Sequence, residues 1–210
     1  MWNYEKRLQF PVNIKEPNAK LAQVIISQFG GPDGELAASM RYLSQRFATP
    51  YKEVAGLLTD IGTEELAYLE MIGAIVFQLT KNLSMEEIKD SGFDKYYIDH
   101  TVGLWPQAAG GVPFNANQFQ SKGDIITDLF EDMAAEQKAR TTYDNILRLV
   151  KDYPDVYAPI KFLRAREIVH FQRFGEALRI TQDNLDSRNF YMMKPGFDKG
   201  MDNTGCGCGC

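Results

Sequence analysis

Apolar side chains recur every three or four residues along most of this 210-residue chain, the period of a helix buried on one face. This pattern predicts helices over about 52–81, 124–151 and 154–184. A further helical pattern runs from residue 18 to about 47, and the run Gly-Gly-Pro-Asp-Gly at 30–34 predicts a break within it. The chain is therefore expected to form four long helical segments.

The connections between these segments predict how they pack. Only a few residues separate the last two helices, so they should lie antiparallel. Residues 82–122 are rich in Gly, Asn, Pro and aromatic residues and predict a long crossover, with one short capped helix beginning at Ser84. Two helix pairs joined by a long crossover between helices 2 and 3 describe an all-α fold, a ferritin-like four-helix bundle.

The two ends of the chain differ from the bundle. Residues 1–18 alternate apolar and polar side chains and contain two prolines, which predicts an extended N-terminal arm. Residues 185–210 have no sustained period and predict an irregular tail that ends in a Gly-Cys repeat. The expected organisation is an arm at 1–18, a dimetal bundle at 19–184 and a tail at 185–210.

Composition narrows the class of protein. Hydrophobic residues make up 44% and charged residues 24%, which is ordinary for a globular protein. The formal net charge is -5 and no basic cluster is present, which argues against a nucleic-acid partner. No apolar run approaches the roughly 20 residues of a membrane span. The N-terminus lacks the features of a signal peptide, so we expect synthesis in the cytoplasm without export by the general secretory route.

The three cysteines, Cys206, Cys208 and Cys210, all lie in the last five residues. An odd number of thiols on a Gly-rich tail cannot all pair within one chain. Two interpretations follow. The thiols form disulfides with neighbouring molecules, or they stay reduced on a disordered tail.

Each of the four helical stripes carries one glutamate among its apolar residues. These residues are Glu35, Glu65, Glu136 and Glu167. An ionised carboxylate on a face that packs into a core is costly unless it is paired or bound to a cation. Four such residues predict a shared cationic partner.

The spacing around these glutamates predicts a dimetal centre. Ferritin-like carboxylate proteins use single glutamates from two helices and a Glu-x-x-His pair from each of the other two. Here Glu167 and His170 form an intact pair, whereas the other pair reads Glu65 and Tyr68, with a phenol in place of the imidazole. Oxygen donors with one or two imidazoles suit manganese or iron better than zinc. Two such ions exchange the two electrons that peroxide reduction or oxidation requires, and iron oxidation or storage is a further hypothesis.

Several other polar residues are given structural interpretations. Glu64, Glu70 and Glu131 lie off the stripes and are expected to be solvated surface charges. Tyr143 is interpreted as a core aromatic and His100 as a loop residue.

Four runs of sequence resemble the manganese catalases. They are Gly-Gly-Pro-Asp-Gly-Glu at 30–35, Tyr-Leu-Ser-Gln at 42–45, Gly-Thr-Glu-Glu-Leu-Ala at 62–67 and Arg-Glu-Ile-Val-His at 166–170. The similarity extends over about 6–184 and resembles in particular the short spore-coat members found in spore-forming bacteria. It implies two manganese ions per chain, disproportionation of hydrogen peroxide to water and dioxygen, a homohexamer and a place in the spore coat or outer spore layer.

The resemblance also implies roles for individual residues. Glu35 would be a terminal ligand of the first manganese, and Glu65 would bridge both ions. Glu136 and His170 would complete the second. Glu167 would move protons from outside the coordination sphere, with Tyr42 as its hydrogen-bonding neighbour at the first ion.

Tyr68 departs from the family, which has a histidine ligand at this position. Three interpretations are open. The phenolate coordinates the metal, although it must lose a proton from a group with an ordinary pKa of about 10. Alternatively the phenol stays neutral and the first ion is bound weakly or not at all, or the helix shifts and water replaces the imidazole. The alternative function is therefore a catalytically impaired structural coat protein, cross-linked through its C-terminal cysteines.

Overall fold

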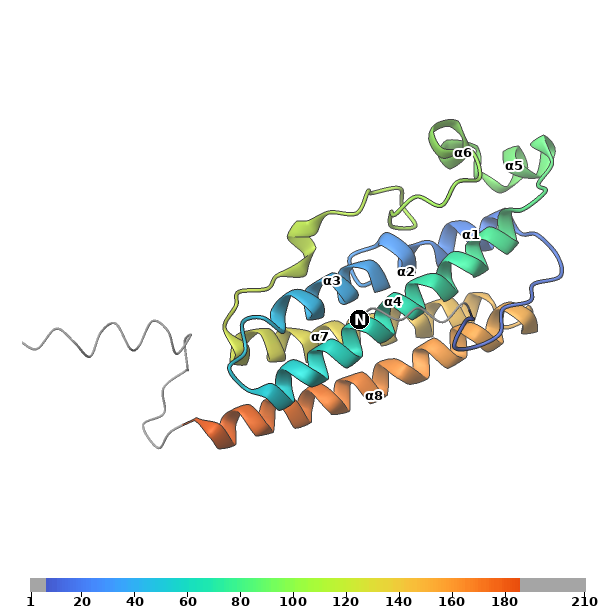
Figure 1. Ribbon diagram of the computed structural model, residues 1–210. Coiled ribbons are helices and arrows are strands. Elements are labelled where there is room, and N and C mark those ends of the chain that lie inside the picture. The colour runs from blue at the N-terminus through green and yellow to red at the C-terminus, as the bar shows by residue number, and fades with distance from the viewer. Residues whose placement is uncertain (1–6, 186–210) are drawn as a thin grey trace, which may run out of the picture.

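The computed structural model describes residues 7–185 and forms an elongated helical bundle (Figure 1). The helices follow one another as α1 (Ala19–Ile25), α2 (Ser27–Gly30), α3 (Glu35–Gln45), α4 (Lys52–Thr80), α5 (Met85–Ser91), α6 (Asp94–His100), the 3-10 turn η1 (Ala116–Phe119), α7 (Ile125–Leu149) and α8 (Pro154–Asn184). The broken rod α1–α3 lies beside α4, and α7 lies beside α8. The predicted all-α bundle with a long crossover is confirmed.

The helix boundaries follow local signals in the sequence. The side chain of Asn18 accepts a hydrogen bond from the backbone N–H of Leu21 and caps α1, and Asp124 caps α7 through the N–H of Thr127. Pro154 occupies the first position of α8, where its missing N–H leaves no bond unmade. These starts, together with the apolar stripes, explain why the three long helices lie within two residues of their predicted bounds.

The break between α2 and α3 brings the crossover close to the bundle. A Cβ atom built on Gly30 would lie 2.4 Å from the backbone N of Gln107 and from the carbonyl carbon of Pro106. A side chain at residue 30 is therefore excluded by the backbone of the crossover. The predicted interruption at 30–34 thus ends α2, and at Gly30 it leaves room for the backbone of the crossover at Pro106 and Gln107.

The crossover contains more regular structure than its composition predicts. The expected capped helix is α5, in which Ser84 and Glu87 form a reciprocal capping box. Helix α6 and the turn η1 were not predicted. The placement of His100 in a loop is wrong, because this residue ends α6, and its ring stacks on Trp105 at 4.8 Å between centroids.

The core consists of two apolar clusters with a polar layer between them along every long helix. On α4 the first cluster takes residues 68–79 and the second takes residues 54–61. On α8 the corresponding stretches are 156–163 and 174–178. The stripe glutamates fall between these stretches. The layering therefore places their carboxylates at one level of the bundle, away from water.

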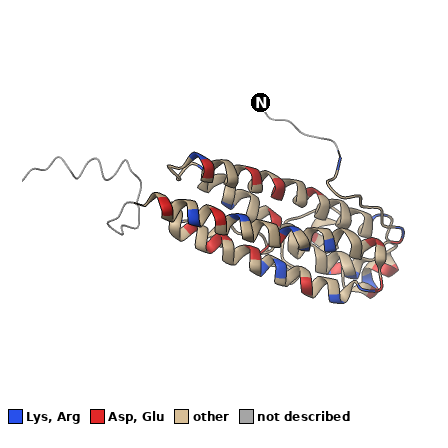
Figure 2. Cartoon of the chain, turned by 90° about the horizontal axis from the view of Figure 1, so that it is seen from below, with Lys and Arg blue, Asp and Glu red and all other residues tan. Residues whose placement is uncertain are grey.

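Acidic and basic residues are interspersed along the outer turns of the long helices (Figure 2). Among the described residues, none of the helices combines the length and the apolar character that crossing a membrane requires. All of the predicted tail except Leu185, including its three cysteines, lies outside the described part of the chain, as do the first six residues of the predicted arm.

Candidate metal centre

The structure brings five of the predicted site residues, from four different helices, to one buried layer. Glu35 is the first residue of α3, because the break before it ends at Gly34. Glu65 comes from α4 and Glu136 from α7, while α8 contributes both Glu167 and His170. Each of the five side chains belongs to a residue that is at most 2% exposed.

Two overlapping groups of ligand atoms form within this layer. Glu65, Glu136 and His170 make one group, which we call the histidine half. Glu35, Glu65 and Glu167 make the other, which we call the oxygen half. In each group the ligand atoms lie within 4.8 Å of one another, and Glu65 belongs to both. The geometry therefore suits two adjacent cations that share one carboxylate.

The polar atoms of the centre face each other without forming a complete set of hydrogen bonds. Nδ1 of His170 lies 2.7 Å from Oε1 of Glu65 and 3.4 Å from Oε2 of Glu136. None of these atoms has a partner aligned for a hydrogen bond. The buried atoms without one are Oε1 and Oε2 of Glu65, Oε2 of Glu136, Oε1 of Glu167 and Nδ1 of His170. Unsatisfied buried lone pairs that converge on a common point fit bound metal ions.

Two tyrosine hydroxyl groups hold carboxylates of the centre. The hydroxyl of Tyr42 donates a hydrogen bond to Oε1 of Glu136, and that of Tyr143 donates to Oε1 of Glu35. The interpretation of Tyr143 as only a core aromatic is therefore wrong. Its position seven residues after Glu136, two turns along the same stripe, was the available signal. Tyr42 was predicted near the first ion, but its hydroxyl donates its hydrogen bond to Glu136, which belongs to the histidine half.

Burial and mutual repulsion dominate the electrostatics of the centre. Burial raises the pKa of the carboxyls of Glu35 and Glu167 well above the usual value, and the charges of neighbouring glutamates raise these pKa values further. Burial also raises the pKa of Glu136. For His170 burial lowers the pKa, but the carboxylates around it, with Glu65 foremost, outweigh that effect and raise the pKa far above its usual value. In the metal-free protein, the raised pKa values of Glu35, Glu167 and His170 therefore favour their protonated forms.

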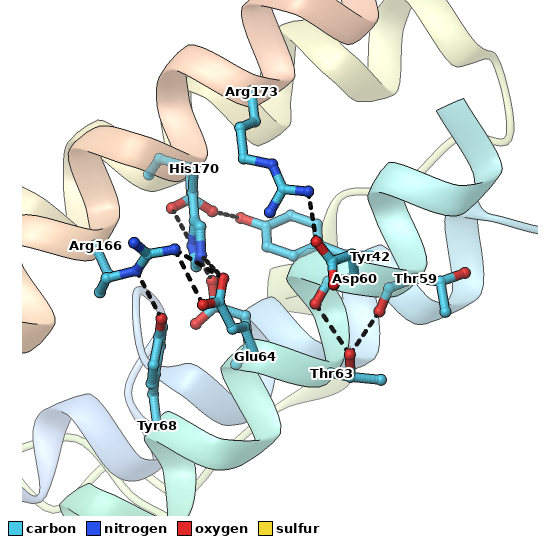
Figure 3. Close-up of polar contacts among 11 residues, drawn as sticks. Tyr42, Thr59, Asp60, Thr63, Glu64, Tyr68, Arg166, His170 and Arg173 are labelled. Carbon is cyan, nitrogen blue, oxygen red and sulfur yellow. Dashed lines mark hydrogen bonds and ion pairs between the residues drawn. The ribbon is translucent and has the colours of Figure 1, made fainter. Parts of the chain in front are cut away.

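Tyr68 is buried, but its hydroxyl is engaged outside the two ligand groups. Nε of Arg166 donates a hydrogen bond to the phenol oxygen at 3.0 Å (Figure 3). The Tyr68 ring lies nearly parallel to the imidazole of His170, with centroids 5.7 Å apart. Burial raises the pKa of the phenol above its usual value and outweighs the nearby cations.

Glu64 and Arg166 are residues that sequence reasoning missed. Oε2 of Glu64 lies 2.8 Å from Nε2 of His170, and Nη2 of Arg166 donates to both carboxylate oxygens at 3.0 and 3.2 Å. The prediction of Glu64 as a solvated charge is wrong, because its off-stripe position turns it toward α8 instead of water. Of the other two, Glu70 is exposed and Glu131 is a partly exposed partner of Lys138.

The metal-free protein is expected to lose stability as pH rises from about 5 to about 8. Above the ordinary carboxyl pKa of 4.5, unfolded chains release protons that Glu35 and Glu167 retain when folded. Above the ordinary imidazole pKa of 6.5, the same holds for His170. Each such group lowers the free energy of unfolding by about 1.4 kcal/mol per pH unit. Glu64 acts oppositely, since its lowered pKa of about 2 adds stability that is lost only in acid.

Urea unfolding at pH 5 and pH 8, with a chelator and with added manganese, measures this trend. Bound cations favour the ionised carboxylates, so the loss should shrink or reverse when metal is present. Equal stability of the chelated protein at both pH values would contradict the electrostatic description of the centre.

Comparisons with known proteins agree with this geometry. Residues 1–199 match the family model of manganese-containing catalases. The protein CotJC of Bacillus subtilis strain 168 is 49% identical over 91% of this chain and 100% of its own length. A probable manganese catalase of Clostridium acetobutylicum is 31% identical, over 90% of this chain and 85% of that protein.

A solved structure extends the similarity to three dimensions. The manganese catalase KatB from Anabaena superposes with a TM-score of 0.81 at 32% identity, over 93% of this chain and 87% of that chain. The family match, the fold and the buried carboxylate–histidine layer lead to one conclusion: this chain belongs to the manganese catalase family.

Proposed function

We propose that the protein disproportionates hydrogen peroxide to water and dioxygen at a dinuclear manganese centre whose oxygen half binds its ion weakly. The observation that carries this proposal is the pair of buried ligand groups that share Glu65 and leave lone pairs without hydrogen-bond partners. Oxygen-rich donor sets suit manganese, and the same sets with imidazole also suit iron. Membership of the manganese catalase family favours manganese.

The ligand roles follow from the two groups. In the histidine half, Glu136 and His170 would hold one ion together with Glu65. In the oxygen half, Glu35 would hold the second ion, again with Glu65 as the shared carboxylate. Tyr42 and Tyr143 would orient the carboxylates of Glu136 and Glu35 through their hydroxyl groups. Such outer partners raise the precision with which ligands face a metal.

Two bound manganese ions would supply a redox pair that exchanges two electrons with peroxide. The chain itself must supply proton transfer, because peroxide loses protons on oxidation and gains them on reduction. Glu167 suits this role, since burial raises its pKa well above the usual value and its Oε1 atom has no hydrogen-bond partner. Its proximity to Glu35 and Glu65 is equally compatible with a ligand role in the oxygen half.

Tyr68 supports a weakened first ion. Its hydroxyl accepts a hydrogen bond from Arg166, and the pKa of the phenol is raised, so the neutral form is favoured over a coordinating phenolate. The oxygen half is then left with carboxylates and no imidazole. Of the three interpretations of Tyr68, we adopt the neutral phenol.

The test uses the full chain, stripped of metal and reloaded with manganese. Elemental analysis should give about two manganese ions per chain at a saturating concentration of manganese. At a low free concentration it should give about one, because the oxygen half binds more weakly. An oxygen electrode should record dioxygen release from peroxide that grows as the second ion binds. A saturated protein with two bound manganese ions and no oxygen release would remove the enzymatic proposal.

A structural role in the spore coat is the second candidate function. It is supported by the position of Tyr68 and by the match to CotJC over that protein's entire length. Self-association, such as the homohexamer, is part of this candidate role. Cys206, Cys208 and Cys210 would link neighbouring coat molecules by disulfides. Absence of both bound manganese and oxygen release would favour this role over catalysis.

A further inference from the structure

Glu64 connects the metal centre to the outside of the bundle. It directly precedes Glu65, so the two side chains point about 100° apart around α4. Glu65 points into the buried layer, whereas Glu64 lies against α8, where Arg166 and His170 stand one turn apart and both contact it (Figure 3). The carboxylate of Glu64 therefore contacts two residues of α8, Arg166 and His170.

The contact with Glu64 determines which nitrogen of His170 carries the proton. A neutral imidazole has one donor nitrogen and one acceptor nitrogen. Oε2 of Glu64 lies 2.8 Å from Nε2, and Nη2 of Arg166 donates to both oxygens of this carboxylate. A carboxylate paired with a guanidinium in this way is ionised. An ionised carboxylate only accepts, so Nε2 must donate. In the neutral imidazole of the metal-bound protein, the lone pair of Nδ1 would then face the space that it shares with Glu65 and Glu136.

Arg166 holds Glu64 in this position and is itself held by Tyr68. Its Nη2 atom donates to both oxygens of Glu64, and its Nε atom donates to the Tyr68 hydroxyl at 3.0 Å. Tyr68 stands one turn after Glu64 on α4, so the guanidinium spans two neighbouring residues of that helix. The planar, permanently charged fork of arginine suits this double contact.

We propose that Glu64, Arg166 and the hydroxyl of Tyr68 are positioning residues that hold the His170 imidazole with Nδ1 toward the metal. This inference rests on the proposed function only in taking His170 as a metal ligand. In this arrangement the Tyr68 phenol orders the histidine half from outside the coordination sphere.

The test uses the full chain loaded with zinc, a diamagnetic substitute for manganese, and labelled with ¹⁵N in its histidines. The chain has only two histidines, and the variant His100→Gln identifies the signals of His170. Nε2 of His170 should carry a slowly exchanging proton and Nδ1 should carry none. A proton on Nδ1, or an unprotonated Nε2, would overturn the proposal. This measurement needs no substitution of Glu64, Arg166 or Tyr68.

Three variants measure the strength of the network by zinc affinity. Glu64→Gln should weaken zinc binding about tenfold to a hundredfold, as loss of an outer partner of a histidine ligand does, and should shift the Nε2–H signal. Tyr68→Phe keeps the ring and loses only the hydroxyl, so it should weaken binding about threefold to tenfold. Arg166→Lys keeps the charge but loses the planar guanidinium, so its loss of zinc affinity should fall between those of the other two variants.

Glu131→Gln is the matched control, because Glu131 is also a partly exposed glutamate with a cationic partner, Lys138, at 3.0 Å. It should leave zinc affinity and the His170 signals unchanged. If Glu64→Gln behaves like this control while melting as a folded protein, the positioning role is lost. A protein with the expected His170 signals that releases no oxygen would remove only the proposed catalysis.

Discussion

Replacing Tyr68 with histidine is expected to raise manganese binding from about one ion to about two per chain at a low free concentration of manganese. The rate of oxygen release should rise by about tenfold or more. Loss of an outer partner alone changes metal affinity about 10- to 100-fold, and a direct imidazole ligand should matter at least as much. The oxygen half has three carboxylates and no nitrogen donor, so it has the most to gain. Elemental analysis and the paramagnetic resonance of bound manganese measure the effect, since isolated and coupled ions give different spectra.

Tyr68→Phe is the control for this gain. It removes the phenol without supplying a ligand, so it should not raise the manganese content. The histidine variant also breaks the hydrogen bond from Arg166, and this loss should slightly weaken the ion at His170. A two-step binding curve separates the two opposite changes. Unchanged manganese content and oxygen release in Tyr68→His would mean that the tyrosine does not limit the centre.

The long helices were predictable from sequence because stripe, cap and break signals agree in them. Helix α4 was predicted over about 52–81 and is found at Lys52–Thr80, and α8 is found at its predicted residues. Helix α6 was missed because its supporting contacts are not periodic. They include the stacking of His100 on Trp105, beyond the end of that helix. Short helices in a Gly-rich crossover depend on such contacts more than on propensity.

The inner part of the candidate centre was also predictable, whereas its surroundings were not. A glutamate inside an apolar stripe is conspicuous, so Glu35, Glu65, Glu136 and Glu167 were found from periodicity alone. Glu64 sits beside one of these residues and has no such mark. Its partners, Arg166 and His170, lie about a hundred residues further along the chain. Only the packing of α4 against α8 brings the three side chains together.

Glu65→Gln is expected to weaken manganese binding in both halves of the centre, by about a hundredfold or more. Glu65 is the one residue that both ligand groups share, and both of its carboxylate oxygens lack hydrogen-bond partners. An amide supplies a single neutral oxygen in place of two charged ones, so it can neither bridge two cations nor offset their charge. Titration of the metal-free variant with manganese, followed by elemental analysis, measures the loss.

Glu35→Gln is the comparison that makes this result specific. Glu35 belongs only to the oxygen half, so its variant should keep the ion at His170 and Glu136 and lose the other. Both glutamates are buried, and both substitutions replace a carboxylate with an amide of the same size. A general defect of folding would therefore affect both variants alike. If Glu65→Gln lost only one ion, the two groups would not share this residue, and the centre would consist of two independent sites instead of one pair.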